Sequence, residues 1–124
     1  MEKLILHNVN SAERIIKAAA NMRIKCIITG KDDYEMTLDN VLCMKKDYKS
    51  GDPCDYNSNE RSLIVFCDVT DKHMDKLLFE LRNSDSNVDY KACLTAVNRK
   101  WKLSMMLNQM EREKLSYMRQ IEKK

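Results

Sequence analysis

Residues 90–110, YKACLTAVNRKWKLSMMLNQM, decide the fold because they join three local signals in one short stretch. Tyr90 to Thr95 is a short apolar run of the kind that forms a buried strand. Arg99 to Lys102 is a basic turn that contains the only tryptophan of the chain. Ser104 then offers a helix N-cap, and apolar residues recur at helical spacing after it. The stretch therefore predicts a strand, a turn and a capped helix, in that order.

The first half of the chain contains a similar unit. Residues 25–29 match residues 91–95, and further upstream residues 4–6 match residues 63–65 at a spacing of 59. We expect the N-cap at Ser11 to correspond to the one at Thr70. The remaining matches pair Ile15 with Met74, Ala19 with Leu78, Tyr34 with Trp101, and Thr37 with Ser104. A strand–helix–strand–turn–helix unit is therefore predicted to occur twice.

We expect residues 1–124 to form one domain, because this length supports one modest core. Its parts are a first βαβα repeat at 1–44, a polar loop or linker at 45–61, and a second repeat at 62–124 with an extended C-terminal helix. The prediction is an α/β fold with pseudo-twofold symmetry and a mostly parallel four-stranded sheet of order 2-1-3-4. The helix signal after each strand favours a small, wholly parallel, doubly wound sheet. A ferredoxin-like βαββαβ sheet with an added C-terminal helix is the alternative.

The second half resembles a known family. Its strand LIVFCDV, its helix MDKLLFEL and the stretch from Tyr90 onward are similar to the C-terminal module of the bacterial family called domain of unknown function 3783. The resemblance covers about residues 62–115. It implies an α/β fold and brings no function. Cys93 stands where the family usually has valine, and Met105-Met106 replace leucines. The matching positions are Lys91, Ala92, Leu94, Thr95, Asn98, Trp101, Ser104 and Leu107.

Bulk composition narrows the class of protein. A net charge of +3 falls short of the dense basic surface of a nucleic-acid binder, so nucleic acid is not an expected partner. Met1-Glu2-Lys3 leads directly into an apolar strand, which does not resemble a signal peptide. The apolar runs are shorter than the roughly 20 residues of a membrane span. We therefore expect a cytoplasmic protein with free, buried thiols.

The basic turn is the first candidate ligand site. Cations around a tryptophan can stack a nucleotide ring and hold a phosphate. Asp68 and Thr70 follow a strand of the second repeat, where doubly wound sheets bind ligands. The structural alternative is that the tryptophan fills a corner of the core, as Tyr34 does in the first repeat, and that the acidic residues cap a helix. The candidate ligand-binding residues are Asp68, Thr70, Asn98, Arg99, Lys100 and Trp101.

The sequence contains little evidence of a catalytic, metal-binding or phosphate-binding site. There is no Cys-x-x-Cys pair, and no histidine stands at metal-ligand spacing from a cysteine. A nucleophilic thiol needs a base, and His7 and His73 are the only histidines of the chain. The strand-to-helix turns lack a glycine-rich phosphate loop. We predict no catalytic residue, no metal and no cofactor.

The last helix carries the main functional prediction. Its apolar residues recur near helical spacing up to Ile121, and methionine-rich faces adapt to partners. We expect Met110, Tyr117, Met118 and Ile121 to form an interface. The prediction is a binding protein without enzymatic activity that acts through self-association, as a possible homodimer, or through a protein partner. A small-ligand or nucleotide-binding regulatory module is the second hypothesis, and an enzyme of unknown type is the third.

Overall fold

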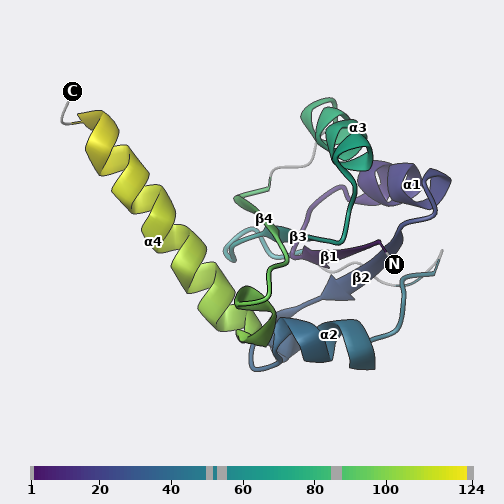
Figure 1. The fold of residues 1–124 in the computed structure, drawn as a ribbon, viewed down its shortest axis with the longest axis horizontal. Helices are drawn as coiled ribbons and strands as arrows, with labels where there is room; N and C mark the ends of the chain where they lie inside the picture. The colour runs from purple at the N-terminus through teal and green to yellow at the C-terminus, as the bar shows by residue number, and fades with distance from the viewer. Residues whose placement is uncertain (1, 50–51, 53–55, 85–87, 123–124) are drawn as a thin grey trace.

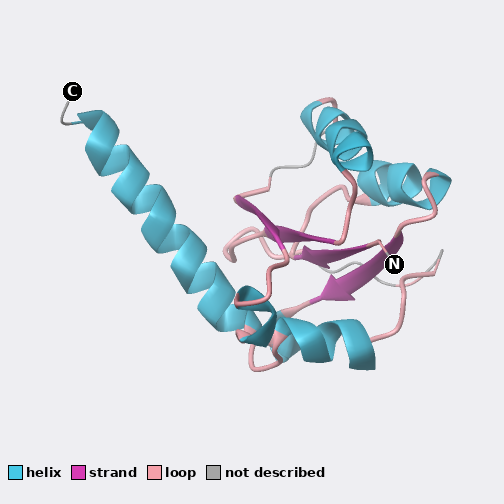
Figure 2. Ribbon diagram, in the orientation of Figure 1, coloured by secondary structure: helices cyan, strands magenta, loops and turns pink. Residues whose placement is uncertain are grey.

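The computed structural model describes residues 2–49, 52, 56–84 and 88–122, and for residues 116–122 it describes the backbone only. Four strands form one sheet in the order β2-β1-β3-β4, with helices on both sides (Figures 1 and 2). The strands are β1 Lys3–His7, β2 Lys25–Thr29, β3 Leu63–Cys67 and β4 Tyr90–Cys93. The helices are α1 Glu13–Asn21, α2 Leu38–Met44, α3 Asp71–Arg82 and α4 Leu103–Glu122. Two short 3₁₀ turns, η1 Lys31–Asp33 and η2 Asn98–Lys100, precede α2 and α4.

The central strand pairing is antiparallel. β1 pairs in parallel with β2, β3 pairs in parallel with β4, and β1 runs antiparallel to β3 with Ile5 opposite Val65. The predicted strand order and mostly parallel sheet are confirmed. The wholly parallel version is wrong, because the second βαβ unit is turned around relative to the first. The ferredoxin-like alternative is also wrong, since in that split βαβ arrangement the two strands of each unit are not neighbours.

The sheet separates two apolar clusters. On one face α1 and α3 cover alternate strand residues such as Leu4 and Phe66. On the other face α2 and the first turns of α4 cover residues such as Ile5 and Val65. All five residues of β3 are buried, because this inner strand is covered on both faces. The halves thus show the repeat-like βαβα pattern within a single domain.

The predicted spacing of 59 between the halves is wrong by one residue in the strands. Leu4 belongs to the cluster under α1 and α3, whereas its predicted match Leu63 belongs to the opposite cluster. A spacing of 60 places Leu4 on Ile64 and Ile5 on Val65, which keeps each residue on its own face. Side chains alternate between faces along a strand, so a shift of one residue exchanges the faces.

The helix caps follow the prediction at two positions out of four. The hydroxyls of Thr37 and Thr70 accept hydrogen bonds from the backbone N–H groups of Asn40 (3.1 Å) and His73 (3.3 Å). Ser11 is not a cap, because α1 begins at Glu13 with Ala12 at the N-cap position. Ser104 is not a cap either, because it lies inside α4.

Backbone contacts between the two connections explain why α4 begins without Ser104 as its cap. The N–H of Leu103 donates to the carbonyl of Met36 at 2.8 Å, and the N–H of Leu38 donates to the carbonyl of Trp101 at 3.0 Å. The N–H of Ser104 donates to the carbonyl of Tyr34 at 3.1 Å. The first N–H groups of a helix need partners from outside it. Here the connection before α2 supplies them for α4, and the connection before α4 supplies one for α2.

Candidate functional site

Asn98 lies at the centre of the turn that was predicted to bind a ligand. Its polar groups form hydrogen bonds within that turn. Its side-chain oxygen accepts from the N–H of Thr95 at 2.8 Å, and its amide donates to the carbonyl of Cys93 at 2.9 Å. The N–H of Asn98 in turn donates to the hydroxyl of Thr95 at 3.0 Å. Asn98 is buried. Its side chain therefore closes the turn after β4, and its amide group is already satisfied there.

The charged residues of the turn lie at the surface. Arg99 is held by an ion pair of 2.8 Å with Asp39 of α2. The hydrogen bond to Asp39 raises the pKa of Arg99, and the charge of Asp68 adds a smaller contribution. Lys100 is exposed. The parallel β3–β4 pairing thus brings Asp68 near Arg99 at one end of the sheet, as predicted for strand ends.

Trp101 and Thr70 lie on opposite faces of the sheet. Trp101 packs partly buried against the cluster under α2 and α4, as Tyr34 does after η1. Thr70 is the N-cap of α3, and its N–H donates to Glu2 at 3.1 Å. The six predicted ligand residues therefore do not form one site, and their ligand role stays a prediction. Trp101 also borders a groove of about 280 Å³ along α4, with Met105, Asn108, Gln109 and Arg112.

The four cysteines that the structure describes differ in burial. Burial raises the pKa of Cys67 to about 12, so this thiol stays protonated. Cys26 is buried as expected, but Cys43 and Cys93 are exposed, which corrects the prediction that the thiols are buried. Within the described residues no three histidine, cysteine, aspartate or glutamate side chains are placed to hold a metal ion.

A different hollow lies at the carboxyl ends of β1 and β2. It has a volume of about 270 Å³ and is lined by segments that are distant in the sequence. The segments are His7 and Asn8 after β1, residues 30–34 after β2, and Tyr56, Asn57 and Glu60 before β3. We call it the His7 hollow. Neighbouring parallel strands end at the same edge of a sheet, so their following loops form a crevice there.

His7 forms the buried part of this hollow. It is 1% exposed, and its Nδ1 lies 2.8 Å from the hydroxyl of Thr29. Its Nε2 has no hydrogen-bond partner among the described residues. Burial lowers the pKa of His7 from 6.5 to about 4, so the ring is neutral near pH 7. The ring also packs beside Tyr34, with 5.3 Å between the ring centroids.

Asn8 holds the third segment in place. Its amide nitrogen donates to the carbonyls of Asn57 and Glu60, both at 2.9 Å, and to that of Arg61 at 3.3 Å. Its oxygen accepts from the N–H of Asn57 at 2.8 Å. Asn8 has a φ of 53°, which asparagine tolerates better than most residues. One side chain therefore fixes the segment that carries Glu60 against the end of β1.

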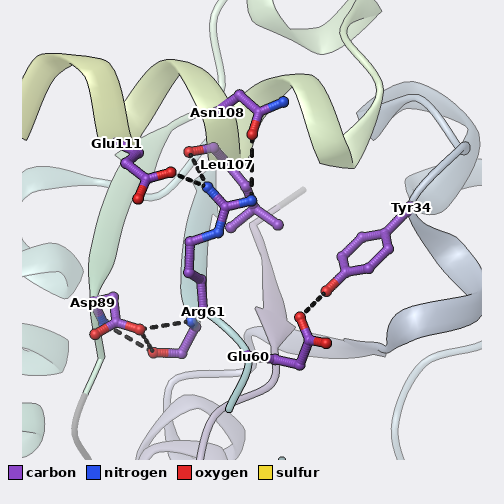
Figure 3. Close-up of polar contacts among 8 residues, drawn as sticks. Tyr34, Glu60, Arg61, Asp89, Leu107, Asn108 and Glu111 are labelled. Atoms are coloured by element: carbon purple, nitrogen blue, oxygen red, sulfur yellow. Dashed lines mark hydrogen bonds and ion pairs between the residues drawn. The ribbon is translucent and has the colours of Figure 1, made fainter.

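Glu60 and Arg61 point in different directions from neighbouring positions (Figure 3). The hydroxyl of Tyr34 donates to Glu60 at 2.9 Å, inside the His7 hollow. Burial and this hydrogen bond both raise the pKa of Tyr34. Arg61 reaches α4 instead, where it pairs with Glu111 at 2.6 Å. This short segment therefore links the hollow to the last helix.

The predicted interface lies on α4. Met110 is partly buried against the cluster under α2 and α4. Tyr117, Met118 and Ile121 belong to the helix, but their side chains lie outside the described residues. Among the residues described, no helix is both long and apolar enough to cross a membrane.

Comparison with known proteins gives a match to a family model. The model of the family "Domain of unknown function (DUF3783)" matches residues 62–117. This confirms the resemblance found in the second half of the sequence, and it covers β3, α3, β4 and most of α4. No curated protein and no solved structure matched the chain.

The sequence did not indicate the His7 hollow as one site, although Asp32 and Asp33 follow a strand end, where ligands are often bound. His7 was considered only as a base for a thiol, and Tyr34 only as a core corner. Glu60 lies in the segment predicted to be a polar loop. The signal that was available was a histidine and an asparagine at the end of a buried strand, where ligands are often bound.

Proposed function

We propose that the protein is a binding module that self-associates through the outer half of α4. The supporting observation is that a seam of mostly apolar positions continues along this helix beyond the last turn that the domain covers. Leu103, Met106 and Leu107 are buried, whereas residues 111–115 are exposed. Figure 1 shows this end of α4 projecting away from the sheet and the other helices.

The spacing of the seam is typical of paired helices. Its positions alternate by four and three residues, the pattern of a coiled-coil seam. They are Leu103, Leu107, Met110, Lys114, Tyr117 and Ile121. A short isolated helix is only marginally stable in water, and most helical stability comes from packing. A second helix would bury the outer part of the seam.

We propose that the seam of α4 pairs with α4 of a second copy of the chain in antiparallel orientation. A twofold contact uses the same surface on both copies, so the seam is sufficient without another partner. In a parallel pair Lys114 would face its own copy, which places like charges together. In an antiparallel pair Lys114 faces a different position of the seam.

Two glutamate substitutions at adjacent positions test this proposal. Tyr117→Glu places a charge in the seam, and Ser116→Glu adds the same charge roughly 100° around the helix, at a position outside the seam. Light scattering and sedimentation of the full chain should show a dimer for the parent and for Ser116→Glu, and a monomer for Tyr117→Glu. A chain truncated after Gln109 should also be a monomer. A parent that is monomeric at all concentrations, or a dimeric Tyr117→Glu variant, contradicts self-association.

A further inference from the structure

The His7 hollow contains a buried polar atom that the protein itself does not satisfy. Nearly all buried polar groups in proteins have a hydrogen-bond partner, and each exception calls for an explanation. Nε2 of His7 is such an exception among the described residues, and its ring is 1% exposed. The position of His7 in the wall of a hollow of about 270 Å³ makes a bound group the simplest explanation.

The charges of the hollow favour a cation. Among the described lining residues, Lys31 is the only lysine or arginine, against the carboxylates of Asp32, Asp33 and Glu60, of which Asp33 is paired with Lys45 from outside the lining. The chain as a whole has a net charge of +3, so the hollow has the opposite sign to the rest of the protein. Carboxylates around a concave site attract cations and repel anions such as phosphate.

The three carboxylates differ in the hydrogen bonds and ion pairs that they already make within the protein. Asp33 accepts from Lys45 at 2.7 Å and from the N–H of Gly30 at 2.8 Å. Glu60 accepts a single described hydrogen bond at its side chain, from the neutral hydroxyl of Tyr34. Asp32 makes no hydrogen bond or ion pair with any residue that the structure describes. Asp32 and Glu60 therefore retain acceptor capacity for a ligand.

The remaining walls suit an organic ion. The rings of Tyr34 and Tyr56 line the hollow, and aromatic faces attract ammonium groups. Its volume lies below the roughly 300–1,000 Å³ of pockets for drug-sized ligands. The ligand must therefore have few heavy atoms.

We propose that the His7 hollow binds a small organic amine in its ammonium form. Glu60 and Asp32 hold the charged nitrogen, the tyrosine rings contact its carbon chain, and Nε2 of His7 hydrogen bonds to a polar group of the ligand. The site does not depend on self-association through α4, because none of its residues lies in that helix.

The two histidines of the chain make a direct experiment possible. Imidazole nitrogen resonances of the full chain are followed by NMR during addition of 1,4-diaminobutane. His7 should shift and His73 should not, because His73 pairs with Glu2 outside the hollow. The uncharged analogue 1,4-butanediol should produce no shift. Unmoved His7 resonances at millimolar diamine, or equal shifts with the diol, overturn the proposal.

A matched pair of variants tests which carboxylate contributes to diamine binding. Glu60→Gln keeps an acceptor for the hydroxyl of Tyr34 but removes the negative charge, and it should weaken diamine binding about tenfold. Glu111→Gln removes the same charge from the α4 side of Arg61 and should leave binding unchanged. Equal binding by the parent and Glu60→Gln refutes the proposed role of the hollow. Asp32→Asn is a second test of the charge. Asp32 is exposed, so the substitution should leave folding unchanged, and it should also weaken diamine binding.

Discussion

Asn8 and Asp68 follow β1 and β3 directly, and both have a left-handed backbone, with φ angles of 53° and 57°. The two positions are related by the spacing of 60 that superposes the strands. Their side chains have different roles, because Asn8 is buried and holds the segment before β3, whereas Asp68 is exposed. The same backbone turn thus closes the His7 hollow in one half and remains open at the surface in the other.

Asn8→Asp should destabilise the protein by about 2 kcal/mol. The substitution keeps the acceptor for Asn57 but replaces the donor to three carbonyls with a second oxygen. Urea unfolding measures the loss. The control is Asp68→Asn, which makes the reverse change at the exposed position and should stay within about 0.5 kcal/mol. Equal effects at the two positions would show that Asn8 does not hold the segment.

Stability should fall as the pH drops from 6.5 to about 4, because of His7. The unfolded chain takes up a proton at this residue below pH 6.5, whereas the folded protein resists protonation until about pH 4. Protonation therefore stabilises the unfolded state relative to the folded state across this window, and the loss of stability amounts to about 3 kcal/mol at its lower end.

Urea unfolding over this pH range measures that effect. His7→Gln should flatten the profile between pH 6.5 and 4, because the titrating group is gone. His73→Gln serves as the matched substitution at the other histidine and should keep the decline in this window. A profile for His7→Gln that follows the parent would contradict the assignment.

Asn98→Ala should cost about 1–3 kcal/mol, because it leaves the N–H of Thr95 and the carbonyl of Cys93 without their partner. Lys100→Ala, two residues away at an exposed position, should have little effect. Thermal or urea unfolding of both variants gives the comparison. A stable Asn98→Ala protein would instead favour the ligand-binding interpretation of this turn.

Thr37→Ala should destabilise the protein by about 1 kcal/mol through loss of the cap on α2. Ser104→Ala should be neutral or slightly stabilising, because Ser104 lies within α4 and alanine has the higher helix propensity. The two substitutions are compared by urea unfolding. A larger loss at Ser104 would mean that α4 begins later than Leu103.

The strands, the helices and their order could be predicted because their signals are local. The apolar run Leu63–Cys67 and the cap at Thr70 follow from a few neighbouring residues. The register between the halves could not be predicted. β3 is buried on both faces, so its sequence does not alternate between polar and apolar residues, and the pattern leaves the face of each side chain open.

The direction of β3 and the existence of the His7 hollow could not be predicted from the sequence for a related reason. Both depend on the polar segment between the halves, which carries few local signals. Glu60 and Tyr34 are 26 positions apart, and Asn8 and Asn57 are 49 positions apart, so these contacts form only in the complete fold. A histidine inside an apolar run also gives no sign that one of its nitrogens lacks a partner.

The antiparallel pairing of β1 with β3 gives the molecule two separate carboxyl edges at opposite ends of the sheet. One edge carries the His7 hollow, and the other carries Asp68 and Arg99. The family match at residues 62–117 includes none of the residues that line the hollow. The family match thus covers the edge that carries Asp68 and Arg99, whereas the His7 hollow lies at the edge outside the match.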